Sequence, residues 1–251
     1  MLTSERKALI LDTLRREGRV VAKEVSHRLG LSEDTIRRDL RELAGEGLLQ
    51  RVHGGALPSS PAVADYAARE RISLYAKARL GRAGARLIRP GQVVFLDGGT
   101  TNVEVARHLP PDLRLTVVTH SPSIAVELAD HPGVEVELVG GRLFKHSVVA
   151  MGAGCVEALR RIRADLFVMG ATGVHAELGL TTGHAEEAAL KRLIAEQSAE
   201  IVVLATRDKL GAASPFGIVP LAEIGTLVVE PDLSADLLDP LAACGIDIVA
   251  A

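Results

Sequence analysis

Aromatic side chains are scarce in this sequence of 251 residues: they make up 2% of it, and tryptophan is absent. Proteins that bind single-stranded nucleic acid stack its bases on aromatic side chains, so that function is not expected here. The chain is nevertheless 47% hydrophobic. Its core must therefore consist mainly of Leu, Val, Ile and Ala.

Cysteine is almost as scarce, because Cys155 and Cys244 stand alone and form no CxxC-type pair. Such spacing predicts small apolar side chains in a reducing compartment and no disulfide framework. No apolar run reaches the roughly 18 residues of a membrane-spanning helix. The charges in the opening MLTSERKALI do not fit a signal peptide. We therefore expect a cytoplasmic protein without a membrane partner.

The formal net charge of −3 does not by itself suggest a DNA-binding protein. Residues 1–57 contain 11 Lys and Arg against 9 Asp and Glu, whereas residues 58–251 contain 18 against 23. The basic excess is thus confined to the N-terminal segment. Because it is small, the positions of the arginines matter more than their number.

Three short helical patterns begin the chain. We expect a first helix capped by Ser4, a second over 22–29 followed by the turn residue Gly30, and a third from Ser32 to about Glu46. Two short helices joined by a glycine-containing turn are typical of a helix-turn-helix. The following stretch LLQRVHGGAL predicts a short hairpin.

The third helix carries polar side chains suited to DNA. Ile36, Leu40 and Leu43 are spaced to face inward, which leaves the polar residues outside. Arginine near the start of a recognition helix can bond guanine twice, and hydroxyls can bond phosphate. A solvated surface helix with charge pairs is the alternative. The candidate DNA-binding residues on this helix are Ser32, Thr35, Arg37, Arg38 and Arg41.

From Gly91 the chain changes to short β-branched runs: VVFL, LTVV, VEVELV, LFVM, IVVL and TLVV. Runs that are apolar on both faces indicate a covered sheet of mostly parallel strands joined by helices. The sequence predicts an α/β fold class with a small N-terminal helix-turn-helix domain. We expect DNA binding in residues 1–57, a linker and connecting helix in 58–90 beginning with PSSP, and an effector-sensing domain in 91–251.

Ligands of parallel sheets bind beyond the carboxyl ends of the strands. The residues after VVFL are Asp97, Gly98, Gly99, Thr100 and Thr101, and a helix follows them. The glycines allow close approach, and the helix start with its two hydroxyls suits a phosphate. A plain tight turn is the alternative. No Gly-Lys-Ser/Thr follows, so this is not a Walker A loop.

Other polar residues near strand ends are expected to line the same pocket. On a later helix, Glu187 and Lys191 lie one turn apart, with a solvated ion pair as the alternative. The further candidate effector-binding residues are His120, Ser121, Gly141, Arg142, Thr172, Glu186, Glu187 and Lys209.

The segment SEDTIRRDL, residues 32–40, resembles the signature of the DeoR family of bacterial repressors, with Arg6 upstream and RVHGGA downstream as in that family. DGGTT, VVTHS, VGGR, MGATG, GLTT, EEAALKR and DKLG are similar to its C-terminal sensor domain and occur in the same order. The resemblance covers nearly the whole chain.

The resemblance implies a winged helix-turn-helix in which Thr35, Arg37 and Arg38 face DNA and Asp39 is structural. It also implies that Arg51 and His53 contact the DNA backbone from the wing, with an ordinary loop role as the alternative for His53.

For the sensor domain, the resemblance implies a relation to sugar-phosphate isomerases and a phosphorylated sugar as effector. The phosphate would bind the glycine–threonine loop, and Lys209 and Glu186 or Glu187 would lie near the sugar hydroxyls. One departure is that the usual VTNS reads VTHS, so that His120 replaces an asparagine. This exchange leaves the identity of the sugar open.

We therefore expect a repressor of a carbohydrate operon that binds double-stranded operator DNA, responds to a phosphorylated sugar and needs no cofactor. Paired operator half-sites favour a homodimer or homotetramer. One alternative is an isomerase or deaminase with Glu186, Glu187 or Asp97 as base. A metal site at His175, His184 and Glu186 is another, although its spacing fits no HExxH helix.

Overall fold

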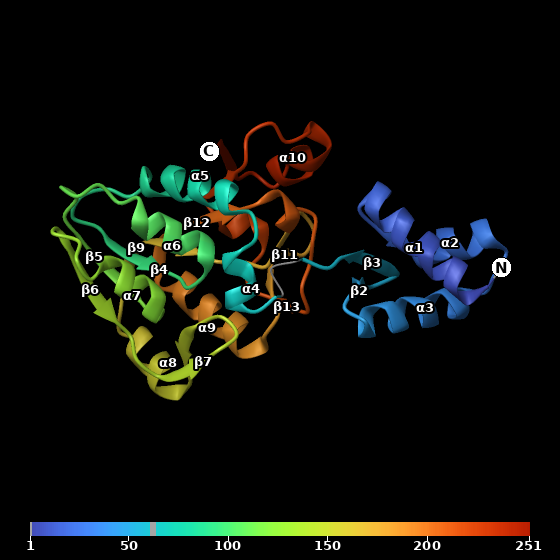
Figure 1. Cartoon of the computed structure of the whole chain (residues 1–251), viewed down its shortest axis with the longest axis horizontal. Helices are drawn as coiled ribbons and strands as arrows, with labels where there is room; N and C mark the ends of the chain where they lie inside the picture. Colours follow the sequence, from blue (N-terminus) through green and yellow to red (C-terminus); the bar gives the residue numbers. More distant parts are fainter. Residues whose placement is uncertain (1, 61–63) are drawn as a thin grey trace.

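The computed structural model describes residues 2–60 and 64–251 and shows two unequal parts (Figure 1). We call residues 2–58 the N-terminal part and residues 64–251 the C-terminal part. Pro61, the last residue of the predicted PSSP linker, lies outside the described residues. Ser59 forms an isolated parallel bridge with Ala213, so the chain leaving the N-terminal part pairs directly with the C-terminal part.

The N-terminal part packs three helices against a small sheet of order β1-β3-β2. Gly18 and Gly30, with φ of 68° and 63°, end the first two helices in the left-handed conformation. The expectation that Ser4 caps the first helix is wrong, since the helix already begins at Thr3. The elements are α1 (Thr3–Glu17), β1 (Val20–Val21), α2 (Ala22–Leu29), α3 (Glu33–Gly45), β2 (Leu49–Val52) and β3 (Gly55–Pro58).

The apolar stripe of α3 is buried as predicted. Ile36, Leu40 and Leu43 are 0%, 2% and 1% exposed and pack with Ile10 of α1. Antiparallel strands β2 and β3 form the predicted hairpin. Helices α2 and α3 with this hairpin are the parts of a winged helix-turn-helix.

One ion pair is buried between α1 and α3. The guanidinium of Arg6 donates two hydrogen bonds to the carboxylate of Asp39, one from Nη2 to Oδ1 at 2.8 Å and one from Nε to Oδ2. Asp39 is fully buried. The structural role implied for Asp39 is therefore the one observed: it holds α3 against α1 and turns away from the DNA face.

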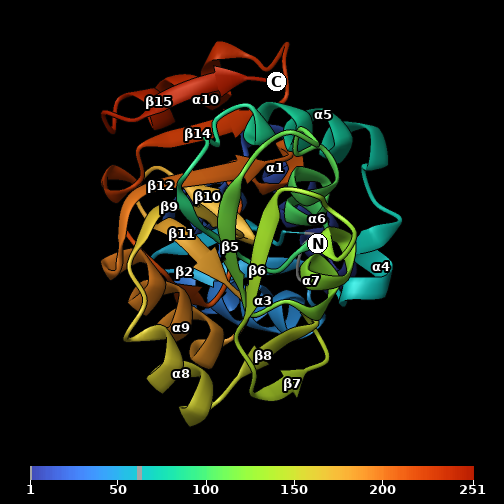
Figure 2. The ribbon, with the colours of Figure 1, turned by 90° about the vertical axis from the view of Figure 1, so that its left-hand side faces the viewer.

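The C-terminal part is built on a seven-stranded sheet of order β15-β14-β12-β9-β4-β5-β6, and all of its neighbouring strands are parallel (Figure 2). Six of these strands are the six β-branched runs, so the predicted fold class is confirmed. The strands are β4 (Val93–Leu96), β5 (Leu115–Thr119), β6 (Val134–Leu138), β9 (Ala164–Met169), β12 (Ser198–Ala205), β14 (Thr226–Val229) and β15 (Asp247–Ala250).

Helices cover both faces of this sheet and create two apolar layers. Alternate residues of β4 enter different layers: Phe95 packs with α8 and α9, whereas Val94 and Leu96 pack with α5, α6 and α7. The helices are α5 (Leu74–Ala85), α6 (Thr100–Arg107), α7 (Pro122–Leu128), α8 (Ala153–Leu159), α9 (Ala185–Glu196) and α10 (Ala235–Ala242).

Smaller elements complete the C-terminal part. The charged stretch expected to connect the domains forms two helices, and the second, α5, contributes the fully buried Leu80 to the core. These elements are α4 (Tyr66–Glu70), β7 (Arg142–Phe144), β8 (Val149–Met151), β10 (Gly173–His175), β11 (Gly179–Thr182), β13 (Phe216–Gly217) and the 3₁₀ turns η2 (Arg207–Lys209) and η3 (Leu221–Glu223). Within the described ranges, none of the helices has the length and apolar character to cross a membrane.

Replacing Asp39 by Ala should leave the guanidinium of Arg6 buried without its counter-charge. Because an unpaired buried charge is strongly destabilising, we expect D39A to lower the free energy of unfolding of the N-terminal part by about 3 kcal/mol. Urea unfolding followed by circular dichroism measures this loss. The control is E42A. Glu42 lies on α3, like Asp39, but it is an exposed partner of Lys7, so its loss should cost less than about 1 kcal/mol. Equal losses would contradict the structural role of Asp39.

Candidate functional site

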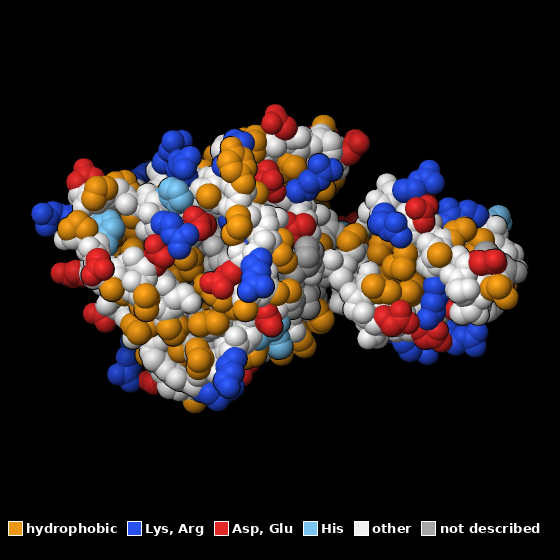
Figure 3. Space-filling view, in the orientation of Figure 1, with side chains coloured by type: hydrophobic (Ala, Val, Ile, Leu, Met, Phe, Trp, Pro, Cys, Tyr) orange, Lys and Arg blue, Asp and Glu red, His pale blue; other side chains and the backbone are white. Residues whose placement is uncertain are grey.

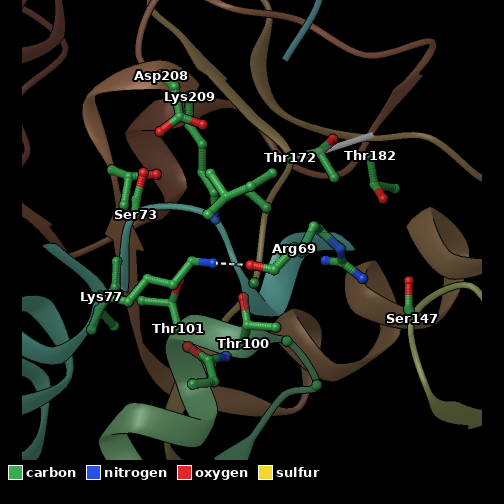
Figure 4. A pocket seen from close by; sticks show the side chains of 18 of the residues that line it. Arg69, Ser73, Lys77, Thr100, Thr101, Ser147, Thr172, Thr182, Asp208 and Lys209 are labelled. Carbon is green, nitrogen blue, oxygen red and sulfur yellow. Dashed lines mark hydrogen bonds between the residues drawn. The ribbon is translucent and has the colours of Figure 1, made fainter. Parts of the chain in front are cut away.

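A pocket opens where strands β4, β9 and β12 end (Figure 4). This is the edge at which parallel α/β sheets bind ligands. The segments after these strands contribute residues 98–102 and 170–172, together with Thr206, Asp208 and Lys209. The other lining residues are Arg69, Ile72, Ser73, Lys77, Ser147, Thr182, Glu187, Lys191 and Leu204.

The loop between β4 and α6 forms one wall of the pocket. Gly99 has a φ of 132°, which side chains other than that of glycine rarely permit, and α6 begins directly after it. At Gly98, a Cβ would lie 2.2 Å from Cγ1 of Val149. The first N–H groups of a helix lack intrahelical partners. With the hydroxyls of Thr100 and Thr101, they provide a site suited to an anion.

Asp97 lies beneath this loop and is 1% exposed. Its carboxylate accepts hydrogen bonds from the N–H groups of Gly98 and Gly170, each at 2.8 Å. It accepts two more, from Nε2 of His120 at 2.9 Å and from the ammonium of Lys191. Burial favours the neutral acid, but the charge of Lys191 and the hydrogen bond from His120 outweigh it and hold the pKa of Asp97 well below its usual range.

His120 is fully buried behind Asp97 and does not line the pocket. Its Nε2 faces a carboxylate oxygen of Asp97, and its Nδ1 lies 3.0 Å from the carbonyl oxygen of Ala150. Because both ring nitrogens face acceptors, this geometry favours the doubly protonated imidazolium. Burial acts to lower the pKa of His120, but the hydrogen bond and charge of Asp97 raise it to about 9.

Glu187 and Lys191 lie on the buried face of α9 at 7% and 3% exposure. The ammonium of Lys191 is 3.4 Å from Oε1 of Glu187, while Oε2 of Glu187 accepts a hydrogen bond of 3.0 Å from Thr182. The alternative of a solvated ion pair is therefore wrong, since both groups form part of the pocket wall.

Several predicted effector-binding residues line the pocket together, although they come from separate parts of the sequence. They are Gly98, Gly99, Thr100, Thr101, Thr172, Glu187 and Lys209.

Four predicted residues lie elsewhere among the described side chains. Ser121 is buried and its hydroxyl faces the carbonyl oxygen of Val148 at 3.4 Å. Gly141 packs against the backbone of β8. Arg142 and Glu186 form an exposed ion pair of 2.9 Å with each other. The structure thus does not bring these four residues to the pocket surface.

Arg69 and Lys77 line the pocket, although the sequence analysis assigned them only to the connecting segment 58–90. A signal for Lys77 does exist: it lies three residues before the core residue Leu80, on the inward face of α5. Basic side chains outnumber acidic ones among the described pocket residues. Burial lowers the pKa of Lys209 to about 8, and the nearby charges of Arg69 and Lys77 add to the effect.

The polar face of α3 is the candidate DNA interface. Ser32 caps α3, with its hydroxyl accepting from the Thr35 N–H at 3.2 Å. Arg37 is exposed and pairs with Glu33 at 2.7 Å. Three further exposed arginines are Arg38 and Arg41 of α3 and Arg51 of the hairpin. Figure 3 shows Lys and Arg side chains along the lower edge of the N-terminal part, where α3 lies in Figure 1.

The histidines proposed as metal ligands have other contacts. His184 packs edge-on against Phe144 at 4.6 Å and against His146 at 4.9 Å between ring centroids. Nδ1 of His175 accepts a hydrogen bond of 3.2 Å from the N–H of Glu177. In residues 2–60 and 64–251, no group of three or more His, Cys, Asp or Glu is arranged to hold a metal ion.

The imidazolium of His120 predicts a pH-dependent stability. Because its folded-state pKa of about 9 exceeds the ordinary value of about 6.5, the stabilisation is complete below about pH 6.5 and is lost as the pH rises toward 9. We expect the Tm of H120N to change less across this interval than that of the unmodified protein, as measured by calorimetry. The control is H27N, which replaces an exposed histidine and should leave the pH dependence of the Tm as it is in the unmodified protein. Parallel Tm curves for H120N and the unmodified protein would contradict a charged ring.

Two family models match the chain. The model described as the DeoR-like helix-turn-helix domain matches residues 6–61, and the DeoR C terminal sensor domain matches residues 73–231.

Curated relatives match along most of their length. The HTH-type transcriptional regulator GlpR of Haloferax volcanii is 36% identical, over 99% of this chain and 98% of that protein. The HTH-type transcriptional repressor GlcR of Bacillus subtilis is 34% identical, over 95% and 94%. The glycerol-3-phosphate regulon repressor of Escherichia coli is 30% identical, over 84% of each chain.

Among solved structures, ribose 5 phosphate isomerase A from Neisseria gonorrhoeae aligns with 53% of this chain and 52% of that chain, at 16% identity and a TM-score of 0.38. This structural similarity is too low to indicate a function. The two family models and the full-length relatives identify the family. The chain belongs to the DeoR family of transcriptional regulators, with a DeoR-like helix-turn-helix domain followed by a DeoR sensor domain.

Proposed function

We propose that this protein represses a carbohydrate catabolic operon and that a phosphorylated sugar, bound in the pocket of the sensor domain, weakens its binding to operator DNA. The observation that carries the proposal is a basic pocket at the start of α6, in a chain whose other domain presents exposed arginines on α3. Two relatives named as the putative aga operon transcriptional repressor and the glycerol-3-phosphate regulon repressor support the same class of function.

The pocket offers different chemistry to the two halves of such an effector. The start of α6, with Thr100 and the ammonium groups of Lys77 and Lys209, suits a phosphate. Thr172 and Glu187 supply a hydroxyl and a carboxylate that can bond sugar hydroxyls.

The same pocket is poorly equipped for isomerase or deaminase chemistry. A carboxylate base must be free to take a proton from the substrate. Asp97 accepts four hydrogen bonds and has a lowered pKa, while Glu187 is bonded to Thr182 and lies beside Lys191. The names of the relatives are likewise those of regulators.

The sugar phosphate acts only if it binds more tightly to a conformation with low operator affinity. Helix-turn-helix proteins read paired half-sites, which supports a homodimer or homotetramer. Binding to operator DNA also supports a cytoplasmic location.

Thr100→Ala and Lys209→Ala should each remove a pocket group that binds the phosphate. A thermal-shift screen of the unmodified protein with fructose 1-phosphate, fructose 6-phosphate, glucose 6-phosphate, ribose 5-phosphate and glycerol 3-phosphate should identify a stabilising compound, because ligand binding to the folded state raises its stability. Both variants should lose most of that shift. The control R161A changes an exposed residue that follows α8 and does not line the pocket, and it should keep the shift. Variants that respond like the unmodified protein would place the effector elsewhere.

Arg38→Ala should weaken operator binding, because an arginine bonded twice to guanine contributes about 1–3 kcal/mol of discrimination, which corresponds to roughly 5- to 150-fold in Kd. Fluorescence anisotropy with DNA from the adjacent promoter at fixed salt measures the change. R16A, an exposed arginine on α1, is the matched control. If R38A binds as tightly as R16A, α3 does not contact the operator through Arg38.

A further inference from the structure

The helix α4 is the first helix after the wing strand β3, and its Arg69 reaches the sensor pocket. Figure 4 shows the ammonium of Lys77 bonded to the carbonyl oxygen of Arg69, with Thr100, at the start of α6, below that bond in this view. Both basic residues come from the segment that leads from the DNA-binding domain into the sensor domain. The pocket wall thus includes a part of the chain that neither the glycine–threonine loop nor the sheet provides.

The hydrogen bonds of Arg69 are incomplete. Its Nη2 donates to the carbonyl oxygen of His146 at 3.2 Å, but Nε is buried and has no hydrogen-bond partner among the described residues. Nearly all buried polar groups in proteins are hydrogen-bonded, so an unpaired buried N–H calls for an acceptor. A guanidinium beside a helix start favours a phosphate, because its planar N–H groups match phosphate oxygens in pairs.

Two backbone carbonyl oxygens accept the hydrogen bonds that hold α4 in place. The carbonyl oxygen of His146 accepts from the N–H of Tyr66 as well as from Arg69, and the carbonyl oxygen of Arg69 accepts from the ammonium of Lys77. Between α4 and α5, Ser73 has a φ of 53°, a conformation that residues with side chains rarely adopt. Strained residues of this kind are common in segments that switch.

We propose that Arg69 binds the phosphate of the effector, and that α4 is the element through which an occupied pocket changes the DNA-binding domain. This role for Arg69 rests on the proposed function. A bound phosphate accepts from the unpaired N–H of Arg69 and fixes α4 against the start of α6. Operator affinity then falls because the position of α4 fixed by the effector disfavours the DNA-bound arrangement.

The test measures binding and DNA release separately. Isothermal titration gives the Kd of the full-length protein for inorganic phosphate and for the sugar phosphate with the largest thermal shift. R69A should raise both Kd values by about 10- to 100-fold, the range for a lost hydrogen bond to a charged group. R69K keeps the charge but not the planar donor pair, so its Kd values should lie between those of R69A and the unmodified protein.

Two controls separate contact from placement. R71A removes an exposed arginine at the end of the same helix and should leave both Kd values unchanged. D65A removes the side chain that caps α4 through the Ala68 N–H at 2.9 Å, and it loosens the helix without removing the guanidinium. If D65A raises the Kd values as much as R69A, or R69A binds within twofold of the unmodified protein, Arg69 does not contact the phosphate.

The second measurement is the release of operator DNA at saturating sugar phosphate, followed by anisotropy. We expect saturated R69A to release less operator than the saturated unmodified protein. Complete release from saturated R69A would overturn the role of α4 in coupling. Circular dichroism shows whether R69A folds. If it does not fold, R69K is compared with the unmodified protein instead. If no sugar phosphate binds the unmodified protein, the proposed function itself fails, which is a different result from equal binding by R69A.

Discussion

The pocket depends on one buried carboxylate, that of Asp97. A charge of this kind is costly to bury unless hydrogen bonds and counter-charges surround it. Its four donors come from four places: its own loop, the loop after β9, the end of β5 and helix α9. These elements can meet only in one arrangement, because any displacement leaves a buried charge unpaired. The carboxylate therefore fixes the floor of the pocket.

The floor of the pocket and its wall contribute differently to ligand binding. Lys191 and His120 are hydrogen-bonded to Asp97, so the positive charges available to a ligand are those of Arg69, Lys77 and Lys209. The carboxylates of Asp208 and Glu187 line the same pocket. Arg69 and Lys77 belong to α4 and α5, and Lys209 belongs to the turn η2. The sheet thus supplies a preorganised surface, while segments outside it supply most of the charge. In a binding site divided in this way, a bound anion can change the position of the segments outside the sheet.

The sequence was most informative where one physical rule acted alone. The six β-branched runs became six parallel strands, and the glycines after α1 and α2 ended those helices. It was least informative where a charged residue was buried. Arg69 and Lys77 were expected only in a connecting helix, and the burial of His120 depends on an acceptor that lies 30 positions away, at Ala150. The two-residue β13 and the three-residue β7, β8 and β10 are too short for a periodic pattern.

Gly98 links the pocket to β8, since a side chain there would collide with Val149. Displacing Val149 would also move Ala150, whose carbonyl oxygen holds the ring of His120. The side chains at positions 98, 149 and 120 are consequently coupled through their packing. A larger residue at 98 would require a smaller one at 149. Sequence covariation among these three positions would record this shared packing.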